Sequence, residues 1–240
     1  MTRPAAGSGA APLLEAVAVM DRLRSPGGCP WDAEQTHASL VRYLLEECYE
    51  LVEAVESGDR AAIREELGDV LLQVLFHARI AAETPRDQGG FDIDDVAGDL
   101  VAKLVRRHPH VFGSAPEQWT AADQQQRWDE LKKTERGKSG VLDGVAFGQP
   151  AVALAAKLGA RAATFGLDVP PVTGVAGPAD GDSADGDPAG SAEVTAVAEE
   201  LFRIAYAAGA RGQDPESALR AVARTHAAAL AAAQARADRG

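Results

Sequence analysis

Two pairs of carboxylates, each three residues apart, are the strongest chemical signal in the sequence. Glu47 and Glu50 form the first pair, and Glu66 and Asp69 form the second. One such pair is most often a solvated helix face, but four carboxylates gathered in a helical core repel one another and lose hydration. They persist only if positive charge lies among them. An all-oxygen ligand set suits Mg²⁺, with Mn²⁺ as a possible substitute.

The segments that carry the two pairs are predicted to be helices, spanning residues 43–56 and 60–82. Gly58 suits a helix end, and Asp59 suits the N-cap of the next helix. At about 100° per residue, the first acid of each pair falls within roughly 60° of apolar residues on its own helix. Because the short turn makes the helices antiparallel, we expect the two pairs to face one another.

The sequence around these acids resembles a known family. Glu46-Glu47-Cys48-Tyr49-Glu50 and Glu66-Leu67-Gly68-Asp69 match the two-part acidic signature of MazG nucleoside triphosphate pyrophosphohydrolases. Gly28-Cys29-Pro30-Trp31-Asp32 upstream and the segment 103–112 downstream match as well. The resemblance covers about residues 13–135. It implies an all-α helical bundle completed by homodimerisation, which hydrolyses a nucleoside triphosphate to the monophosphate and pyrophosphate.

The resemblance assigns expected roles to the acidic residues. Glu47, Glu50, Glu66 and Asp69 would hold one or more Mg²⁺ ions, which would position a water for attack between the α and β phosphoryl groups. Glu46 lies beside a ligand but is turned about 100° away from it. It is the candidate to orient or deprotonate the water, or else an outer-shell or dimer-contact residue.

Lys103 and Arg107 are the candidate phosphate ligands. They lie four residues apart near the end of a helix predicted to begin at about residue 92, so they share one face. Cations at a helix C-terminus are expected from the helix dipole alone. However, four acids and a nucleoside triphosphate bring about eight negative charges together, and one Mg²⁺ offsets only two. The resemblance implies phosphate contacts for both residues.

Three further residues are candidates for contact with the nucleotide. Trp31 either packs a loop onto the bundle or forms a wall of the nucleotide pocket. Trp128 and Lys132 share a face of a helix predicted over residues 121–136. The resemblance suggests that Trp128 lies near the base or sugar and Lys132 near a phosphate. The alternative is a core tryptophan beside a lysine whose charged end reaches solvent.

Composition limits the possible partners and location. The net charge of −12 argues against electrostatic binding to nucleic acid or to an anionic membrane. The sequence has no apolar run of membrane-spanning length, and no basic region followed by an apolar core at the N-terminus. Cys29 and Cys48 are expected to be free thiols. We therefore expect a cytoplasmic protein that binds neither nucleic acid nor membrane.

The 240 residues are predicted to divide into five parts. These are a disordered leader (1–11), the catalytic domain (12–136), a connecting helix (137–168), a flexible linker rich in Gly, Pro and Asp (169–191) and a helical tail (192–240). The tail resembles a degenerate second copy of the MazG unit. Because it lacks a counterpart of the Glu46–Glu50 helix, it is expected to bind no metal.

Other functions are also compatible with the sequence. The family role is removal of surplus or aberrant nucleotides from the pool. A related helical pyrophosphohydrolase of narrower specificity, acting on dUTP or phosphoribosyl-ATP, is one alternative. A non-catalytic helical interaction module, with structural Mg²⁺ or none, is another.

Overall fold

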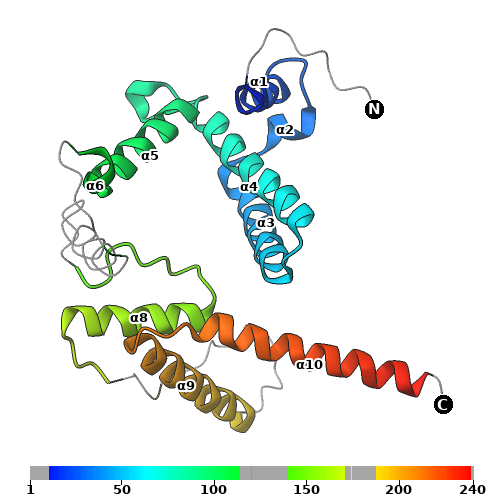
Figure 1. Ribbon diagram of the computed structural model, residues 1–240, viewed down its shortest axis with the longest axis vertical. Coiled ribbons are helices and arrows are strands. Elements are labelled where there is room, and N and C mark those ends of the chain that lie inside the picture. Colours follow the sequence, from blue (N-terminus) through cyan, green and yellow to red (C-terminus); the bar gives the residue numbers. More distant parts are fainter. Residues whose placement is uncertain (1–10, 114–119, 121–139, 171–173, 175–187, 239–240) are drawn as a thin grey trace. The chain divides into compact units, whose positions relative to one another are not determined.

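The computed structural model describes residues 11–113, 120, 140–170, 174 and 188–238. In these ranges the regular structure is entirely helical, which confirms the predicted all-α class (Figure 1). The chain forms two compact units, Met1–Ala122 and Asp123–Gly240. Among the helices of the described ranges, none combines the length and the apolar character needed to cross a membrane.

The first unit is built around one long pair of helices. Its elements are α1 (Pro12–Arg24), α2 (Pro30–Glu34), α3 (His37–Ser57), α4 (Arg60–Ala81), the 3₁₀ helix η1 (Arg86–Gln88), α5 (Ile93–Arg107) and α6 (Pro109–Phe112). Helices α3 and α4 lie side by side over most of their length, and α1 and α2 contact them near one end (Figure 1). The predicted acidic residues all lie on this pair.

The turn between α3 and α4 has the predicted chemistry. Gly58 ends α3 with φ of 74°, a left-handed conformation that favours glycine. The Asp59 carboxylate then accepts hydrogen bonds from the backbone N–H groups of Ala61 and Ala62, at 2.8 and 3.3 Å. These local interactions fix the antiparallel arrangement of the two helices.

The start of α3 differs from the prediction. The helix begins at His37 rather than at residue 43, because Thr36 and Ser39 form a reciprocal capping box. The Thr36 hydroxyl accepts from the Ser39 backbone N–H at 3.1 Å, and the Ser39 hydroxyl accepts from the Thr36 N–H at 3.0 Å. A serine in place of the more usual Glu or Gln makes this cap difficult to recognise in the sequence. Helix α2 also occupies part of the expected loop.

A buried arginine joins α1, α2 and α4. The Arg24 guanidinium donates two hydrogen bonds of 2.9 Å to the Glu83 carboxylate, just after α4. It also donates to the carbonyl oxygens of Asp32 and Gln35, in and just after α2. Its Cζ atom lies 5.5 Å from the centre of the Phe76 ring, which belongs to the core cluster of Met20, Leu40, Leu75 and Phe76. Arg24 therefore fixes α2 against the core.

The second unit contains three described helices, α8 (Ala151–Phe165), α9 (Pro188–Ala210) and α10 (Pro215–Ala237). Helix α9 begins inside the segment predicted to be a linker, with a proline in its first turn, where proline is tolerated. Helices α8 and α9 touch through their backbones. A Cβ atom on Gly159 would lie 2.0 Å from the Tyr206 carbonyl oxygen, and one on Gly209 would lie 1.9 Å from that of Ala156. Only glycine fits at either position.

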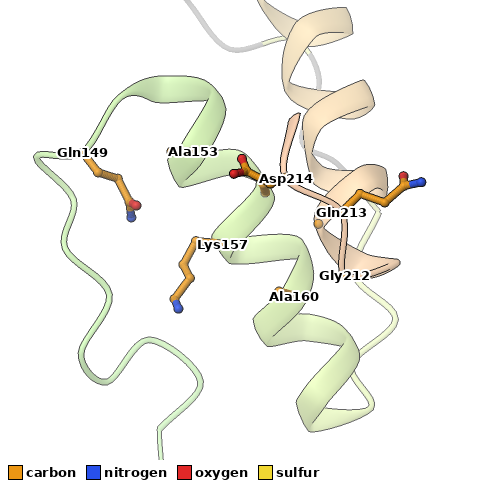
Figure 2. Close-up of a pocket in the computed structure, with 9 residues that line it drawn as sticks. Gln149, Ala153, Lys157, Ala160, Gly212, Gln213 and Asp214 are labelled. Atoms are coloured by element: carbon orange, nitrogen blue, oxygen red, sulfur yellow. The ribbon is translucent and has the colours of Figure 1, made fainter. Parts of the chain in front are cut away.

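Helix α10 leaves this pair at a sharp bend. Gly212 has φ of 74° in the connection, and Asp214 caps the new helix by accepting from the backbone N–H groups of Glu216 and Ser217. A shallow hollow of about 260 Å³ lies between α8 and this connection, lined in part by Lys157 and Asp214 (Figure 2). Within the second unit, α10 then extends away from α8 and α9 (Figure 1).

Candidate metal centre

Three acidic side chains from two helices meet between α3 and α4. Glu47 on α3 and Glu66 and Asp69 on α4 each offer a carboxylate oxygen, and these oxygens lie within 4.8 Å of one another. All three residues are partly buried. Because Glu66 and Asp69 are three residues apart on one helix, both face α3 from neighbouring positions.

Glu50 lies at the edge of this group. It is exposed and is not one of the three residues that meet within 4.8 Å. Its charge nevertheless raises the pKa of both Glu47 and Glu66, and a hydrogen bond to Glu50 contributes to the shift at Glu47. The four predicted ligands therefore form one electrostatically coupled cluster with a compact part of three.

The electrostatics of the cluster are those of crowded acids. The pKa of Glu47 is raised first by desolvation and then by the charges of Asp69, Glu50 and Glu66. The pKa of Glu66 is raised first by desolvation and then by Glu50, Asp69 and Glu65. Within the part of the chain that the structure describes, the charges that cause these shifts all belong to carboxylates.

These residues fit a hard divalent cation. The donors are carboxylate oxygens from two helices, close enough together to bind one ion, and their mutual repulsion would be relieved by positive charge. The donor set contains no sulfur or imidazole, which favours Mg²⁺ or Mn²⁺ over softer metals.

The remaining predicted residues lie elsewhere on the helices of the first unit or outside the described ranges. Glu46 is exposed on α3, and Lys103 and Arg107 are partly buried on α5. Neither Lys103 nor Arg107 is among the groups that shift the pKa of Glu47 or of Glu66. Trp128 and Lys132 lie outside the described residues.

Trp31 packs against the bundle and also reaches the surface. Its ring meets those of Tyr43 and Phe76 edge to face, with centroids 6.0 and 6.4 Å apart. Half of the residue surface remains exposed, at 50%. The packing matches the structural interpretation of Trp31, and the exposed half leaves a surface that a ligand can contact.

Comparison with known proteins identifies the same part of the chain, the segment that contains the acidic cluster. Residues 35–112 match the MazG nucleotide pyrophosphohydrolase domain, and this span contains the four clustered acids, Lys103 and Arg107. The nucleoside triphosphate pyrophosphohydrolase of Mycolicibacterium smegmatis is 47% identical over 209 residues, which are 84% of this chain and 62% of that protein. The chain belongs to the MazG family.

Two other proteins are similar to this chain. The uncharacterized 26.1 kDa protein in the blaB 3′ region of Streptomyces cacaoi is 49% identical, over 92% of this chain and 82% of that protein. The crystal structure of a mazG-related protein from Thermotoga maritima has 30% identity and a TM-score of 0.40, covering 51% of this chain and 97% of that one. The chain spans less than two thirds of the M. smegmatis protein.

The MazG domain also contains a polar group that the sequence analysis did not identify as part of a site. The His37 and His77 rings are parallel within 2°, and their Nδ1 atoms lie 2.7 Å apart. Within the described residues, the buried atoms Gln73 Oε1 and His77 Nε2 have no hydrogen-bond partner. Gln73 and His77 occupy the same helical phase as Glu66 on α4. This shared phase is the feature of the sequence that could have identified them. The pairing with His37 was not visible, because it joins residues far apart in the sequence.

Proposed function

We propose that this chain is a Mg²⁺-dependent nucleoside triphosphate pyrophosphohydrolase, which produces a nucleoside monophosphate and pyrophosphate. The observation that carries the proposal is the meeting of Glu47, Glu66 and Asp69 within 4.8 Å, with raised pKa values at both glutamates. Family membership and the name of the M. smegmatis relative agree with this chemistry.

In this proposal Glu47, Glu66 and Asp69 hold Mg²⁺, and Glu50 completes the set from its edge. Mn²⁺ is a possible substitute, because it accepts the same ligands. When bound, the metal would neutralise phosphate charge and lower the pKa of a coordinated water. Glu46, exposed beside Glu47, orients or deprotonates the attacking water.

The substrate contacts are part of the same proposal. Lys103 and Arg107 on α5 bind phosphate oxygens, because the acids and the triphosphate together exceed the charge of one metal ion. Trp31 offers its exposed half to the nucleotide. Trp128 is assigned to the base or sugar, and Lys132 to a phosphate.

The proposed active form is a homodimer. Apolar residues more than a third exposed lie on the two helices that carry the cluster and on α5: Val41 and Leu45 on α3, Leu67 and Leu71 on α4, and Leu100 and Leu104 on α5. Apolar surface distributed in this way marks an interaction site in a water-exposed protein. A second copy would cover it and complete the wall around the substrate.

The physiological role that follows is removal of surplus or aberrant nucleotides from the cytoplasmic pool. Activity confined to dUTP or to phosphoribosyl-ATP would replace this broad role with a narrower one of the same chemistry. The proposal involves neither nucleic acid nor membrane.

The test is a substrate panel on the full chain. Canonical and oxidised nucleoside triphosphates, dUTP and phosphoribosyl-ATP are incubated with Mg²⁺, and pyrophosphate and orthophosphate are measured separately. Glu47→Gln and Glu66→Gln should each lower pyrophosphate release by more than about 100-fold, since loss of a ligand exceeds loss of an outer-shell group. Glu53→Gln, on the exposed face of α3, is the matched control and should retain activity.

Two results would contradict the proposal. Orthophosphate as the primary product would mean that a different bond is cleaved. Full activity in both acid variants would mean that the cluster is not the catalytic centre. Absence of any phosphate release from the wild type would instead favour a non-catalytic interaction module.

A further inference from the structure

Gln73 is a buried polar residue of α4 whose side-chain oxygen has no hydrogen-bond partner in the described part of the chain. The residue is only 4% exposed. By contrast, Arg24, the other polar residue that is buried among those described, makes four hydrogen bonds through its guanidinium. A buried acceptor without a partner lowers the stability of the folded chain, so its presence in a native fold needs a physical reason.

Gln73 lies one turn beyond the acidic cluster on the same strip of α4. At about 100° per residue, its direction around the helix falls between those of Asp69 and Glu66, roughly 40° from the first and 20° from the second. Gln73 follows Asp69 by four residues, and at that spacing the Cβ atoms of two helical residues are about 5–6 Å apart. The glutamine therefore faces α3 beside the two acids of α4 that meet Glu47.

The neighbouring histidine helps to define the direction of the Gln73 oxygen. His77, one turn further along α4, is hydrogen-bonded through its Nδ1 atom to His37, and its buried Nε2 atom has no partner within the described residues. Because Gln73 Oε1 is also unpaired, these two atoms do not bond to each other. Long side chains on a helix lean toward its N-terminus, which on α4 is the side of Asp69 and Glu66. Helix geometry therefore directs the Gln73 oxygen toward the acidic cluster.

The chemistry of an amide oxygen limits what can pair with it at this place. The Gln73 oxygen only accepts hydrogen bonds, and an ionised carboxylate is also an acceptor, so the charged acids of the cluster cannot satisfy it. Water bound to a divalent cation is a suitable donor, because the cation makes the bound water more acidic than bulk water. Mg²⁺ also keeps several waters when it is bound by carboxylates. A hydrated cation on the cluster would therefore supply the donor that Gln73 lacks.

We propose that Gln73 is a positioning residue of the metal centre, whose Oε1 atom accepts a hydrogen bond from a water bound to the divalent cation. The inference rests on the proposed function, because the cation is the one assigned to Glu47, Glu66 and Asp69. Loss of a group that orients a metal's ligands typically lowers metal affinity by about 10–100-fold. Gln73 thus lowers the stability of the metal-free chain and raises its affinity for the metal.

Gln73→Met in the full chain tests both effects. Methionine is unbranched and of similar length, but it has no amide oxygen. Binding of Mn²⁺ alone, measured by electron paramagnetic resonance without nucleotide, should show a Kd about 10–100-fold higher than that of the wild type. Thermal unfolding of the metal-free variant should show a melting temperature at least about 2 °C higher, because a buried unpaired acceptor has been removed.

Three companion variants separate the role of the oxygen from that of packing. Gln73→Glu keeps an acceptor oxygen at the same position, and its Mn²⁺ affinity should be at least that of the wild type. Leu75→Met is the matched control, because Leu75 is 5% exposed and lies roughly 180° from Glu66 around α4. Its Kd for Mn²⁺ should stay within about twofold of the wild-type value. Glu47→Gln removes a proposed ligand and should weaken Mn²⁺ binding whether or not Gln73 has a role.

Several outcomes would overturn the role of Gln73. These are an unchanged Kd in Gln73→Met, an equal loss of affinity in Gln73→Glu or Leu75→Met, and a lower melting temperature of metal-free Gln73→Met. The second would mean that packing of α4 controls the affinity, and the third that the amide stabilises the metal-free fold. If Glu47→Gln also bound Mn²⁺ like the wild type, the proposed metal centre itself would be wrong. Weakened binding in Glu47→Gln with normal binding in Gln73→Met would refute only the role of Gln73.

Discussion

Replacing Arg24 with methionine should strongly destabilise the first unit. The Arg24 side chain is only 4% exposed, whereas its partner carboxylate on Glu83 is 43% exposed. Glu83 can therefore regain water when the guanidinium is removed, and the ion pair contributes little to the loss. The Gln35 carbonyl loses its Arg24 donor in a partly buried place, which costs roughly 1–3 kcal/mol. The Asp32 carbonyl also loses Arg24 but keeps a hydrogen bond of 3.3 Å from the Gln35 backbone N–H, so its loss is smaller.

Methionine keeps most of the apolar contact with Phe76, so the cavity left behind is small. We expect Arg24→Met to lower the free energy of unfolding by about 2–4 kcal/mol. For a unit of this size the melting temperature should fall by roughly 8–16 °C. Urea and thermal unfolding followed by circular dichroism measure both quantities.

Arg79→Met is the matched control. Arg79 pairs with Asp21 at 2.8 Å and with Glu83 at 3.1 Å, but the Asp21 side chain is 64% exposed. Exposed pairs of this kind contribute about 0.2–1 kcal/mol. If both variants lost less than about 1 kcal/mol, burial of the Arg24 guanidinium would not be what fixes α2 against the core.

Three other perturbations have defined outcomes. Mg²⁺ at about 100 times its Kd should stabilise the folded chain by about 2.7 kcal/mol, and thermal unfolding should show that Glu47→Gln abolishes this gain. Without metal, Glu47→Gln should instead stabilise the chain at neutral pH, because the raised pKa of Glu47 means that its negative charge opposes folding. His77 has a lowered pKa, caused first by desolvation and then by His37. Wild-type stability should therefore fall as pH drops below 6.5 toward the folded pKa, and His77→Gln should flatten the unfolding midpoint across that window. Gly209→Ala places a Cβ atom 1.9 Å from the Ala156 carbonyl oxygen and should lower the free energy of unfolding in urea by about 1–3 kcal/mol. In the control Gly98→Ala the new Cβ atom has no atom within 4 Å, and the free energy of unfolding should rise by about 0.5–1 kcal/mol.

The parts of the structure that the sequence predicted are those set by local rules. Gly58 and Asp59 define a turn through backbone conformation and capping, and helical phase then places Glu47 opposite Glu66. Because both rules act over a few residues, the αα-hairpin and the position of its acids could be predicted from the sequence.

The features that escaped prediction depend on contacts between distant residues. The hydrogen bond between His37 and His77 requires the register of two helices and the rotamers of both rings. Arg24 gives no sign in the sequence that its guanidinium is buried, because three helices, α2, α3 and α4, separate it from its partner Glu83 along the chain. The divergence of α10 from α9 depends on the single left-handed residue Gly212. Composition and periodicity contain none of this information.

The αα-hairpin of α3 and α4 has a consequence for how the protein folds. All four acids belong to one continuous stretch of chain closed by a tight turn, so bringing them together requires no distant part of the polypeptide. Low contact order of this kind is associated with rapid folding. The carboxylates should therefore be close together early, while the chain is still being synthesised, and a cation captured at that point would help to hold the growing domain in shape.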